Sequence, residues 1–107
     1  MSAAADEIFI SLGDPTRRAI FERLCRKGEQ TVWMLTEHAG VSQPAVSKHL
    51  SVLKQSGLVR DRREGRQTHY SADPKGLAPL IDWMSVYTAF WREKFDALED
   101  MLKRMDQ

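Results

Sequence analysis

The stretch SQPAVSKHLSVLKQSGLV, residues 42–59, specifies the fold of this chain. Ser42 is a strong helix N-cap, Pro44 fits a first helical turn, and Gly57 is typical of the position just after a helix end. An apolar stripe recurs between them at helical spacing, made of Val46, Leu50 and Leu53. This pattern predicts an amphipathic helix over residues 43–56 that buries one face.

The opposite face of this helix carries small, polar and basic side chains: Gln43, Ala45, Ser47, Lys48, His49, Ser51 and Lys54. Such side chains suit the edges of DNA bases and the neighbouring phosphates. Gln43 can pair with adenine, and Ala45 can contact a thymine methyl group. Residues 47–49 lie near the helix start, within reach of bases and phosphates. Ser42 can also bind a phosphate, and Ser51 and Lys54 are better placed for the DNA backbone.

The segments on either side of this helix complete a known supersecondary pattern. Residues 32–39 (VWMLTEHA) predict a short helix that ends at Gly40, and a helix, a tight glycine turn and a second helix form a helix-turn-helix. Two strand-like runs, 58–63 and 67–72, then form a hairpin, or wing, over residues 58–72. Arg62, Arg63 and Arg66 crowd its tip, where they can reach phosphates or a minor groove. Gln30 and Thr31 fit a very short strand beside the wing.

Three segments together resemble the ArsR/SmtB family of bacterial winged-helix repressors. They are LGDPTRRAIFERL (12–24), VSQPAVSKHLSVLKQSGLV (41–59) and RDRREGRQTHYSAD (60–73), and the resemblance covers nearly the whole chain. It implies a mainly α fold with a small β-hairpin: a winged helix-turn-helix of about five helices, in one domain over 1–107. It also implies a repressor that binds double-stranded DNA. Arg17 and Arg18 of the first motif either hold the second helix in place by ion pairs or touch DNA.

The net charge of +1 hides a local excess of positive charge. Residues 42–72 hold six Lys or Arg against two Asp or Glu, whereas the segments before and after them are each slightly acidic. A local basic patch is what phosphate binding requires. Each of these cations has an alternative interpretation as an ordinary solvated surface charge.

The composition and the absence of targeting signals predict a small cytoplasmic protein, and the family resemblance implies a bacterial one. The single cysteine cannot form an internal disulfide, and no apolar run approaches the roughly 20 residues of a membrane span. We expect neither a signal peptide nor an enzyme, because no phosphate loop, paired carboxylates or activated nucleophile is visible.

The last predicted helix, 75–105, opens with Asp73 as N-cap and Pro74 in its first turn. It carries two series of residues spaced by seven that form a near-complete heptad seam: Ile81, Thr88, Phe95, Leu102 and Met84, Trp91, Leu98, Met105. About 28 helical residues form a rod of roughly 42 Å, which a compact domain of this size cannot cover. We therefore predict a homodimer that packs these seams together, with Ile8 and Leu12 of the first helix alongside. The alternative is that the stripe is intramolecular core.

A two-fold dimer would place two recognition helices roughly 34 Å apart, which predicts an inverted-repeat target. The aromatic side chains of the last helix can line a pocket for an unknown small-molecule effector, although core packing is the commoner fate of such residues. A protein–protein module that uses the same fold without DNA remains the alternative function.

Metal ligands of the kind that this family uses are missing from the sequence. The resemblance implies a Cys-x-Cys motif before the recognition helix, or Asp and His ligands on the last helix, and neither is present. Cys25, His38, His49 and His69 lie on four different predicted elements, whereas a zinc site needs about four converging ligands. We therefore predict no metal site, no cofactor and no metal response, and we expect Cys25 to be a small core residue. A metal or redox response through an unrecognised site is the alternative.

Overall fold

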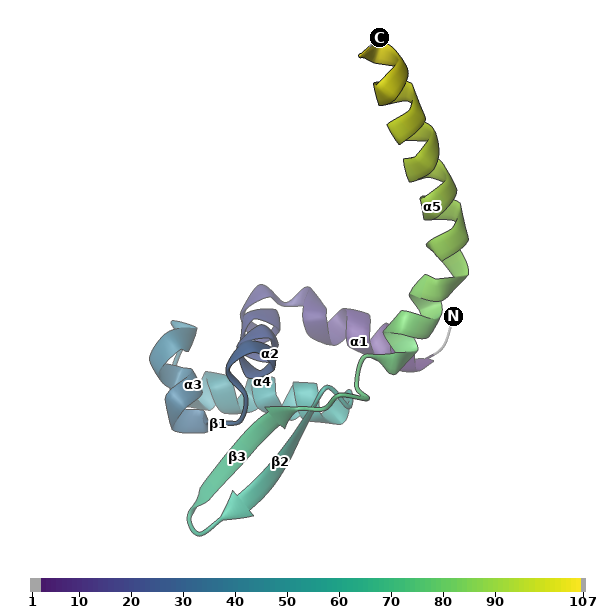
Figure 1. Ribbon diagram of the computed structural model, residues 1–107. Helices are drawn as coiled ribbons and strands as arrows, with labels where there is room; N and C mark the ends of the chain where they lie inside the picture. The colour runs from purple at the N-terminus through teal and green to yellow at the C-terminus, as the bar shows by residue number, and fades with distance from the viewer. Residues whose placement is uncertain (1–2, 107) are drawn as a thin grey trace.

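The computed structural model describes residues 3–106, which form five helices and a three-stranded antiparallel sheet (Figure 1). The elements in chain order are α1 (Ala3–Gly13), α2 (Pro15–Lys27), β1 (Gln30–Thr31), α3 (Val32–Ala39), α4 (Gln43–Gln55), β2 (Val59–Glu64), β3 (Gln67–Ala72) and α5 (Ala78–Met105). The predicted fold class, a mainly helical winged helix-turn-helix, is confirmed.

The ends of α4 are fixed by the residues that the sequence singles out. Ser42 Oγ accepts a hydrogen bond from the Ala45 N–H at 3.4 Å. At the other end Gly57 adopts a φ of 79°, and the Leu58 N–H donates to the Leu53 carbonyl at 3.0 Å. This pattern is a Schellman motif, which only a residue that tolerates positive φ can close without strain. The helix ends at Gln55, one residue earlier than predicted.

The sheet has the strand order β1-β3-β2, so β3 lies in the middle. Gln30 pairs with Tyr70 and Thr31 with His69, which confirms the predicted short strand beside the wing. The hairpin of β2 and β3 projects from the body of the domain, well away from the C-terminal end of α5 (Figure 1).

The core lies where the helices meet the base of the wing. Its buried members are Ile8, Ile20, Phe21, Leu24, Leu35, Val46, Leu50, Leu53, Leu58 and Val59. The prediction that Ile8 belongs to a dimer interface is wrong, because its side chain is only 1% exposed within a single subunit. The periodicity of α1 predicts that one of its faces is apolar, but it does not say what covers that face. At Ile8, the core of the same chain covers it.

The start of the last helix differs from the prediction. Residues 73–77 form a turn, and α5 begins at Ala78 with no side-chain cap. The Asp73 carboxylate accepts from the Lys75 N–H at 3.0 Å, so it caps this turn instead of the helix. The Asp73 N–H donates to the Leu58 carbonyl at 2.9 Å, which holds the start of this turn beside the end of α4.

Gly76 allows this turn to pack against the end of α4. A Cβ atom at Gly76 would collide with the carbonyl oxygen of Gly57 and lie 2.9 Å from Leu58 Cα. Both neighbours are backbone atoms, which cannot rotate away. We expect Gly76→Ala to lower the free energy of unfolding by about 1–3 kcal/mol, measured by urea denaturation. Gly13→Ala is the matched control, because nothing lies within 4 Å of its added methyl group. Equal stability of the two variants would contradict close packing at Gly76.

Helix α5 leaves the body of the domain and projects into solvent (Figure 1). None of its residues is buried, and the radius of gyration of the chain is 18.4 Å, whereas a compact domain of this length has about 13 Å. Only its beginning packs on the domain, where Trp83 stacks edge-on against Phe9 of α1 at 5.1 Å between ring centroids. The tertiary structure of the single chain therefore leaves most of this helix uncovered.

Candidate nucleic-acid interface

Helices α3 and α4 form the predicted helix-turn-helix. Thr31 caps α3 by accepting a hydrogen bond from the Met34 N–H at 3.1 Å, and Gly40 ends it in the left-handed conformation with a φ of 71°. Val46, Leu50 and Leu53 of α4 are fully buried. The opposite face of α4 is open to solvent, as the amphipathic pattern predicts, and its exposed members are Ser42, Gln43, Ser47, Lys48, Ser51 and Lys54, with Ala45 half-buried.

His49 does not lie on this open face. Its side chain is half-buried, and its Nδ1 atom is buried with no hydrogen-bond partner among residues 3–106. The pKa of Asp14 is lowered chiefly because the Arg17 N–H donates to its carboxylate, and the proximity of His49 lowers it further. His49 therefore packs towards the start of α2, and its predicted place on the DNA-facing side of α4 is corrected. Helical spacing places residue 49 at the boundary between the two faces of α4, where only the packing of α2 decides its environment.

The two faces of the wing differ in their charges. Val59 is buried in the core and pairs with Ala72, so alternation along β2 places Asp61 and Arg63 on this inner face. Arg60, Arg62 and Glu64 lie on the outer face. The adjacent arginines 62 and 63 thus point to opposite sides of the sheet, although the sequence predicts the same role for both.

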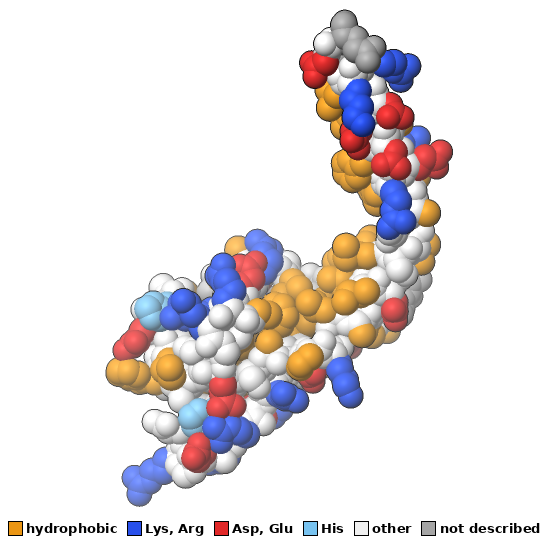
Figure 2. Space-filling view, in the orientation of Figure 1, with side chains coloured by type: hydrophobic (Ala, Val, Ile, Leu, Met, Phe, Trp, Pro, Cys, Tyr) orange, Lys and Arg blue, Asp and Glu red, His pale blue; other side chains and the backbone are white. Residues whose placement is uncertain are grey.

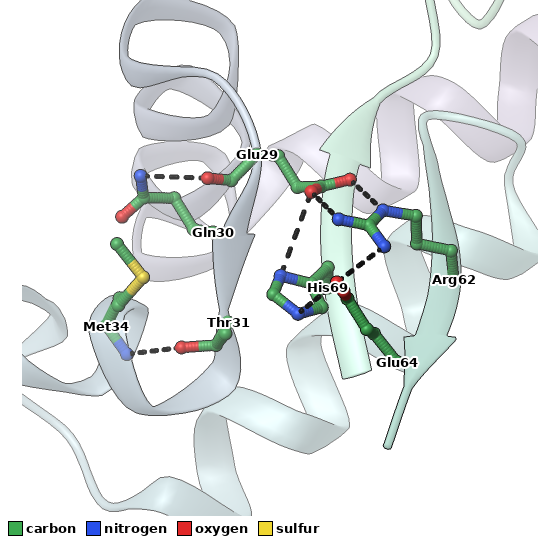
Figure 3. Close-up of polar contacts among 7 residues, drawn as sticks. All are labelled: Glu29, Gln30, Thr31, Met34, Arg62, Glu64 and His69. Carbon is green, nitrogen blue, oxygen red and sulfur yellow. Dashed lines mark hydrogen bonds and ion pairs between the residues drawn. The ribbon is translucent and has the colours of Figure 1, made fainter. Parts of the chain in front are cut away.

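Arg62 is held by carboxylates on the outer face (Figure 3). Its Nε and Nη2 atoms donate to the two carboxylate oxygens of Glu29 at 2.9 and 2.7 Å, and its Nη1 atom donates to Glu64 at 2.9 Å. The pKa of Glu29 is lowered, chiefly by the hydrogen bonds from Arg62, and the pKa of Arg62 is raised by Glu29 first and by Glu64 second. Arg62 is therefore engaged within the chain, which argues against its predicted role as a phosphate ligand.

Lys54 is also paired within the chain, since its Nζ lies 3.0 Å from the Asp61 carboxylate on the inner face of the wing. Lys48, Arg63 and Arg66 are exposed and form no ion pair with the described residues. Of the five cations that the sequence predicts to contact DNA, these three are left free for phosphates. The sequence could not separate them from Lys54 and Arg62, because the acidic partners come from other segments of the chain.

Arg17 and Arg18 form no ion pair with the described residues, and they bind backbone carbonyls instead. Arg17 donates from Nε to the Ser11 carbonyl at 2.6 Å and from Nη2 to the Ile10 carbonyl at 3.1 Å, and Arg18 donates from Nη1 to the Leu12 carbonyl at 2.7 Å. The last carbonyls of a helix lack partners within it and attract cations. The two arginines thus cap the end of α1 from the following helix.

Cys25 is exposed, which corrects its predicted place in the core. The pKa of its thiol is raised by desolvation and by the carboxylate of Glu22, so the reactive thiolate is disfavoured. Among residues 3–106, no three His, Cys, Asp or Glu side chains are arranged so that they could hold a metal ion. In the same part of the chain, no helix has the length and apolar character needed to cross a bilayer.

Comparison with known proteins agrees with this architecture. Residues 14–61 match the sequence profile of the bacterial regulatory proteins of the arsR family. The chain is 37% identical to the transcriptional repressor SdpR of Bacillus subtilis (strain 168) over 79 residues, which cover 74% of this chain and 87% of SdpR. It is 49% identical to the HTH-type transcriptional regulator Rv2034 of Mycobacterium tuberculosis H37Rv, over 70% of this chain and 69% of that protein.

A solved structure supports the same assignment. The ArsR-like transcriptional regulator from Rhodococcus sp. RHA1 superposes with a TM-score of 0.72 at 29% identity, and the match covers 92% of each chain. The profile match spans α2 to the start of β2, which includes the whole helix-turn-helix. Sequence, fold and relatives converge, and the chain belongs to the ArsR family of DNA-binding transcriptional regulators.

Proposed function

We propose that this regulator is a homodimeric repressor that binds an inverted repeat in double-stranded DNA. The observation that carries the proposal is the uncovered apolar face of α5. Two subunits joined through this face would present two α4 helices and two wings to one side of a duplex. Occupation of an operator in this way would block access to a promoter, and SdpR, a similar protein, is named a repressor.

The apolar face of α5 is large and continuous along the helix. Trp91 is 55% exposed and Phe95 is 63% exposed in the single subunit. Figure 2 shows apolar side chains running from the body of the domain onto this helix, with charged side chains gathered on its outer half. Burial of one such side chain is worth roughly 1.5–3 kcal/mol, so exposure of this surface to water is energetically unfavourable. The proposed interface contains Leu12, Ile81, Met84, Thr88, Trp91, Phe95, Leu98, Leu102 and Met105.

A second copy of the same chain is the partner that fits this face. The apolar positions repeat every seven residues, which suits packing against an equivalent helix. The outer half of α5 has mixed charge, so it lacks the single-sign surface that would select an acidic or a basic partner. A two-fold axis would make the DNA target an inverted repeat with half-sites roughly 34 Å apart.

Within each half-site, the exposed residues of α4 are proposed to read the DNA. Gln43, Ala45 and Ser47 lie on the face of the first two turns and are suited to base edges. Ser42, Lys48 and Ser51 are proposed to bind phosphates beside them. Arg63 and Arg66 of the wing are proposed to bind phosphates or an adjacent minor groove.

We further propose that the regulator does not respond to metals and that its effector, where one exists, is a small molecule of another kind. Cys25, His38, His49 and His69 lie on α2, α3, α4 and β3 respectively, and among residues 3–106 no three His, Cys, Asp or Glu side chains are grouped so that they could hold a metal ion. The raised pKa of the Cys25 thiol also disfavours thiolate ligation.

Selection of bound sequences from a random duplex pool tests the proposal directly. Purified protein is expected to enrich an inverted repeat whose half-sites are one helical turn apart, and addition of Zn²⁺ is expected to leave the measured affinity unchanged. Enrichment of no sequence would support a protein–protein module instead. Enrichment of a single half-site would contradict the dimeric reading of DNA.

The dependence of affinity on salt tests the contribution of the wing. Each phosphate that the protein neutralises adds roughly 0.9 to the steepness of the plot of log affinity against log salt concentration. Arg63→Ala combined with Arg66→Ala is therefore expected to reduce the slope by roughly 0.9 for each phosphate that the variant no longer neutralises. Lys103→Ala combined with Arg104→Ala, near the far end of α5, removes the same charge and should not change the slope. An unchanged slope in the wing variant would exclude the wing from the interface.

A further inference from the structure

We propose that Glu29, which lies outside both the helix-turn-helix and the wing, is a positioning residue for DNA binding. Its carboxylate holds Arg62 and thereby fixes the direction in which the wing leaves the domain. Arg62 is then an anchor of the wing and makes no phosphate contact. This inference rests on the proposed function only in its effect on DNA affinity, because the anchoring itself can be measured on the free protein.

The contact between Glu29 and Arg62 joins two parts of the chain that are far apart in sequence. Glu29 follows Gly28, which ends α2 with a φ of 79°, and immediately precedes β1. Arg62 lies on β2, at the other edge of the sheet, so the side chains reach across the middle strand (Figure 3). The two parallel hydrogen bonds form a bidentate fork, which is the geometry that gives an arginine–carboxylate pair its directional rigidity. Such a pair resists rotation of the strand more effectively than a single ion pair would.

The middle strand contributes to the same cluster. His69 of β3 pairs with Arg62 across the hairpin, and its Nδ1 and Nε2 atoms each lie 3.7 Å from a carboxylate oxygen, of Glu29 and Glu64 respectively. All three strands or their immediate flanks therefore meet at one outer-face cluster, made of Glu29, Arg62, Glu64 and His69. We call this cluster the outer clasp.

The wing is also attached to the body of the domain on its inner face, through Asp61, which precedes Arg62. Asp61 binds Lys54 of α4 at 3.0 Å, and Asp61 and Arg62 point to opposite sides of β2. Beyond these two residues, the hairpin tip formed by residues 63–67 is exposed. A two-stranded ribbon has little stability or rigidity of its own, and β1 supports it over only two residues. The two contacts at residues 61 and 62 are thus the last points at which the body of the domain controls the wing.

The direction of the wing matters for DNA binding because its unpaired arginines lie beyond the contacts at residues 61 and 62. Arg63 and Arg66 contact DNA productively only when the hairpin points towards the duplex that α4 occupies. A wing that moves freely must be ordered on binding, and the lost conformational freedom weakens the complex. The outer clasp keeps the wing ordered before DNA arrives, and Glu29 is the only carboxylate of the clasp that belongs to the body of the domain.

Glu29→Gln and Glu64→Gln form a matched pair of variants. Each variant removes the negative charge of one carboxylate that binds the Arg62 guanidinium. Glu64 lies on the same strand as Arg62, however, so its contact does not link the wing to the body of the domain. We expect Glu29→Gln to weaken specific DNA binding by roughly tenfold for a dimer with two clasps, with an unchanged salt slope. Glu64→Gln is expected to cause no loss of affinity. In the free protein, amide hydrogen exchange in β2 and β3 should be faster for Glu29→Gln than for Glu64→Gln.

An Arg62→Gln background shows whether Glu29 acts through Arg62. In that background, Glu29→Gln should have no further effect on affinity. Tighter binding by Glu29→Gln, or a shallower salt slope for Arg62→Gln, would overturn the inference, because either result would make Arg62 a phosphate ligand that Glu29 restrains. Unchanged hydrogen exchange in the wing would also overturn it. Failure of the wild-type protein to bind any duplex would instead refute the proposed function, while the exchange measurement would still test the clasp.

Discussion

Trp91→Asp combined with Leu98→Asp is expected to convert the proposed dimer into a monomer in sedimentation experiments and to weaken binding to the proposed inverted repeat by at least about 100-fold. Both side chains occupy the seam of α5 and are about half-exposed in one subunit. Burial of two carboxylates against apolar side chains, without a compensating cation, costs several kcal/mol even after partial relaxation. The loss of affinity follows because each half-site must then be bound independently.

Ala89→Asp combined with Ala97→Asp is the matched control for this experiment. The same two charges are added to the same helix, but the two alanines lie on the side opposite the seam and are exposed. This variant should remain dimeric and bind DNA as the wild type does. Equal masses for the two double variants would show that the seam is not the dimer interface. A monomeric seam variant that keeps full affinity would show that dimerisation is unnecessary for DNA binding.

Leu50→Ala is expected to produce a large loss of stability. The Leu50 side chain is fully buried in the core, with its neighbours Lys48 and Ser51 exposed on the proposed DNA face. Truncation of a buried leucine costs about 2–5 kcal/mol, partly from reduced apolar burial and partly from the cavity that remains. Domains of this size have a free energy of unfolding of only about 5–15 kcal/mol, so a large share would be lost.

Chemical denaturation of Leu50→Ala and Ser51→Ala separates packing from DNA contact. Ser51→Ala should leave the free energy of unfolding nearly unchanged, since Ser51 is exposed. Its effect should appear only in DNA affinity. Similar stabilities of the two variants would contradict the orientation of α4 described above.

The local signals in the sequence predict most of the fold. The amphipathic pattern of residues 43–56, the Ser42 cap and the Gly57 stop are interactions within one helix, so they can be recognised without knowledge of the rest of the chain. The same is true of the two strands of the wing and of the short strand at Gln30. The predicted start of α5 is too early because Asp73 and Pro74 are equally compatible with a helix start and with a turn. The contact between Gly76 and the end of α4 favours the turn.

The order of the residues is enough to establish which faces of the helices are apolar, where α4 begins and, to within one residue, where it ends, and that positive charge gathers between residues 42 and 72. Only the folded chain establishes that Ile8 is core, that His49 turns towards α2, and which of the cations are already paired. The physical reason is that periodicity and capping depend on neighbours within a few residues. Burial and ion pairing depend on partners such as Glu29, which lies 33 residues from Arg62 and meets it only after the sheet has formed.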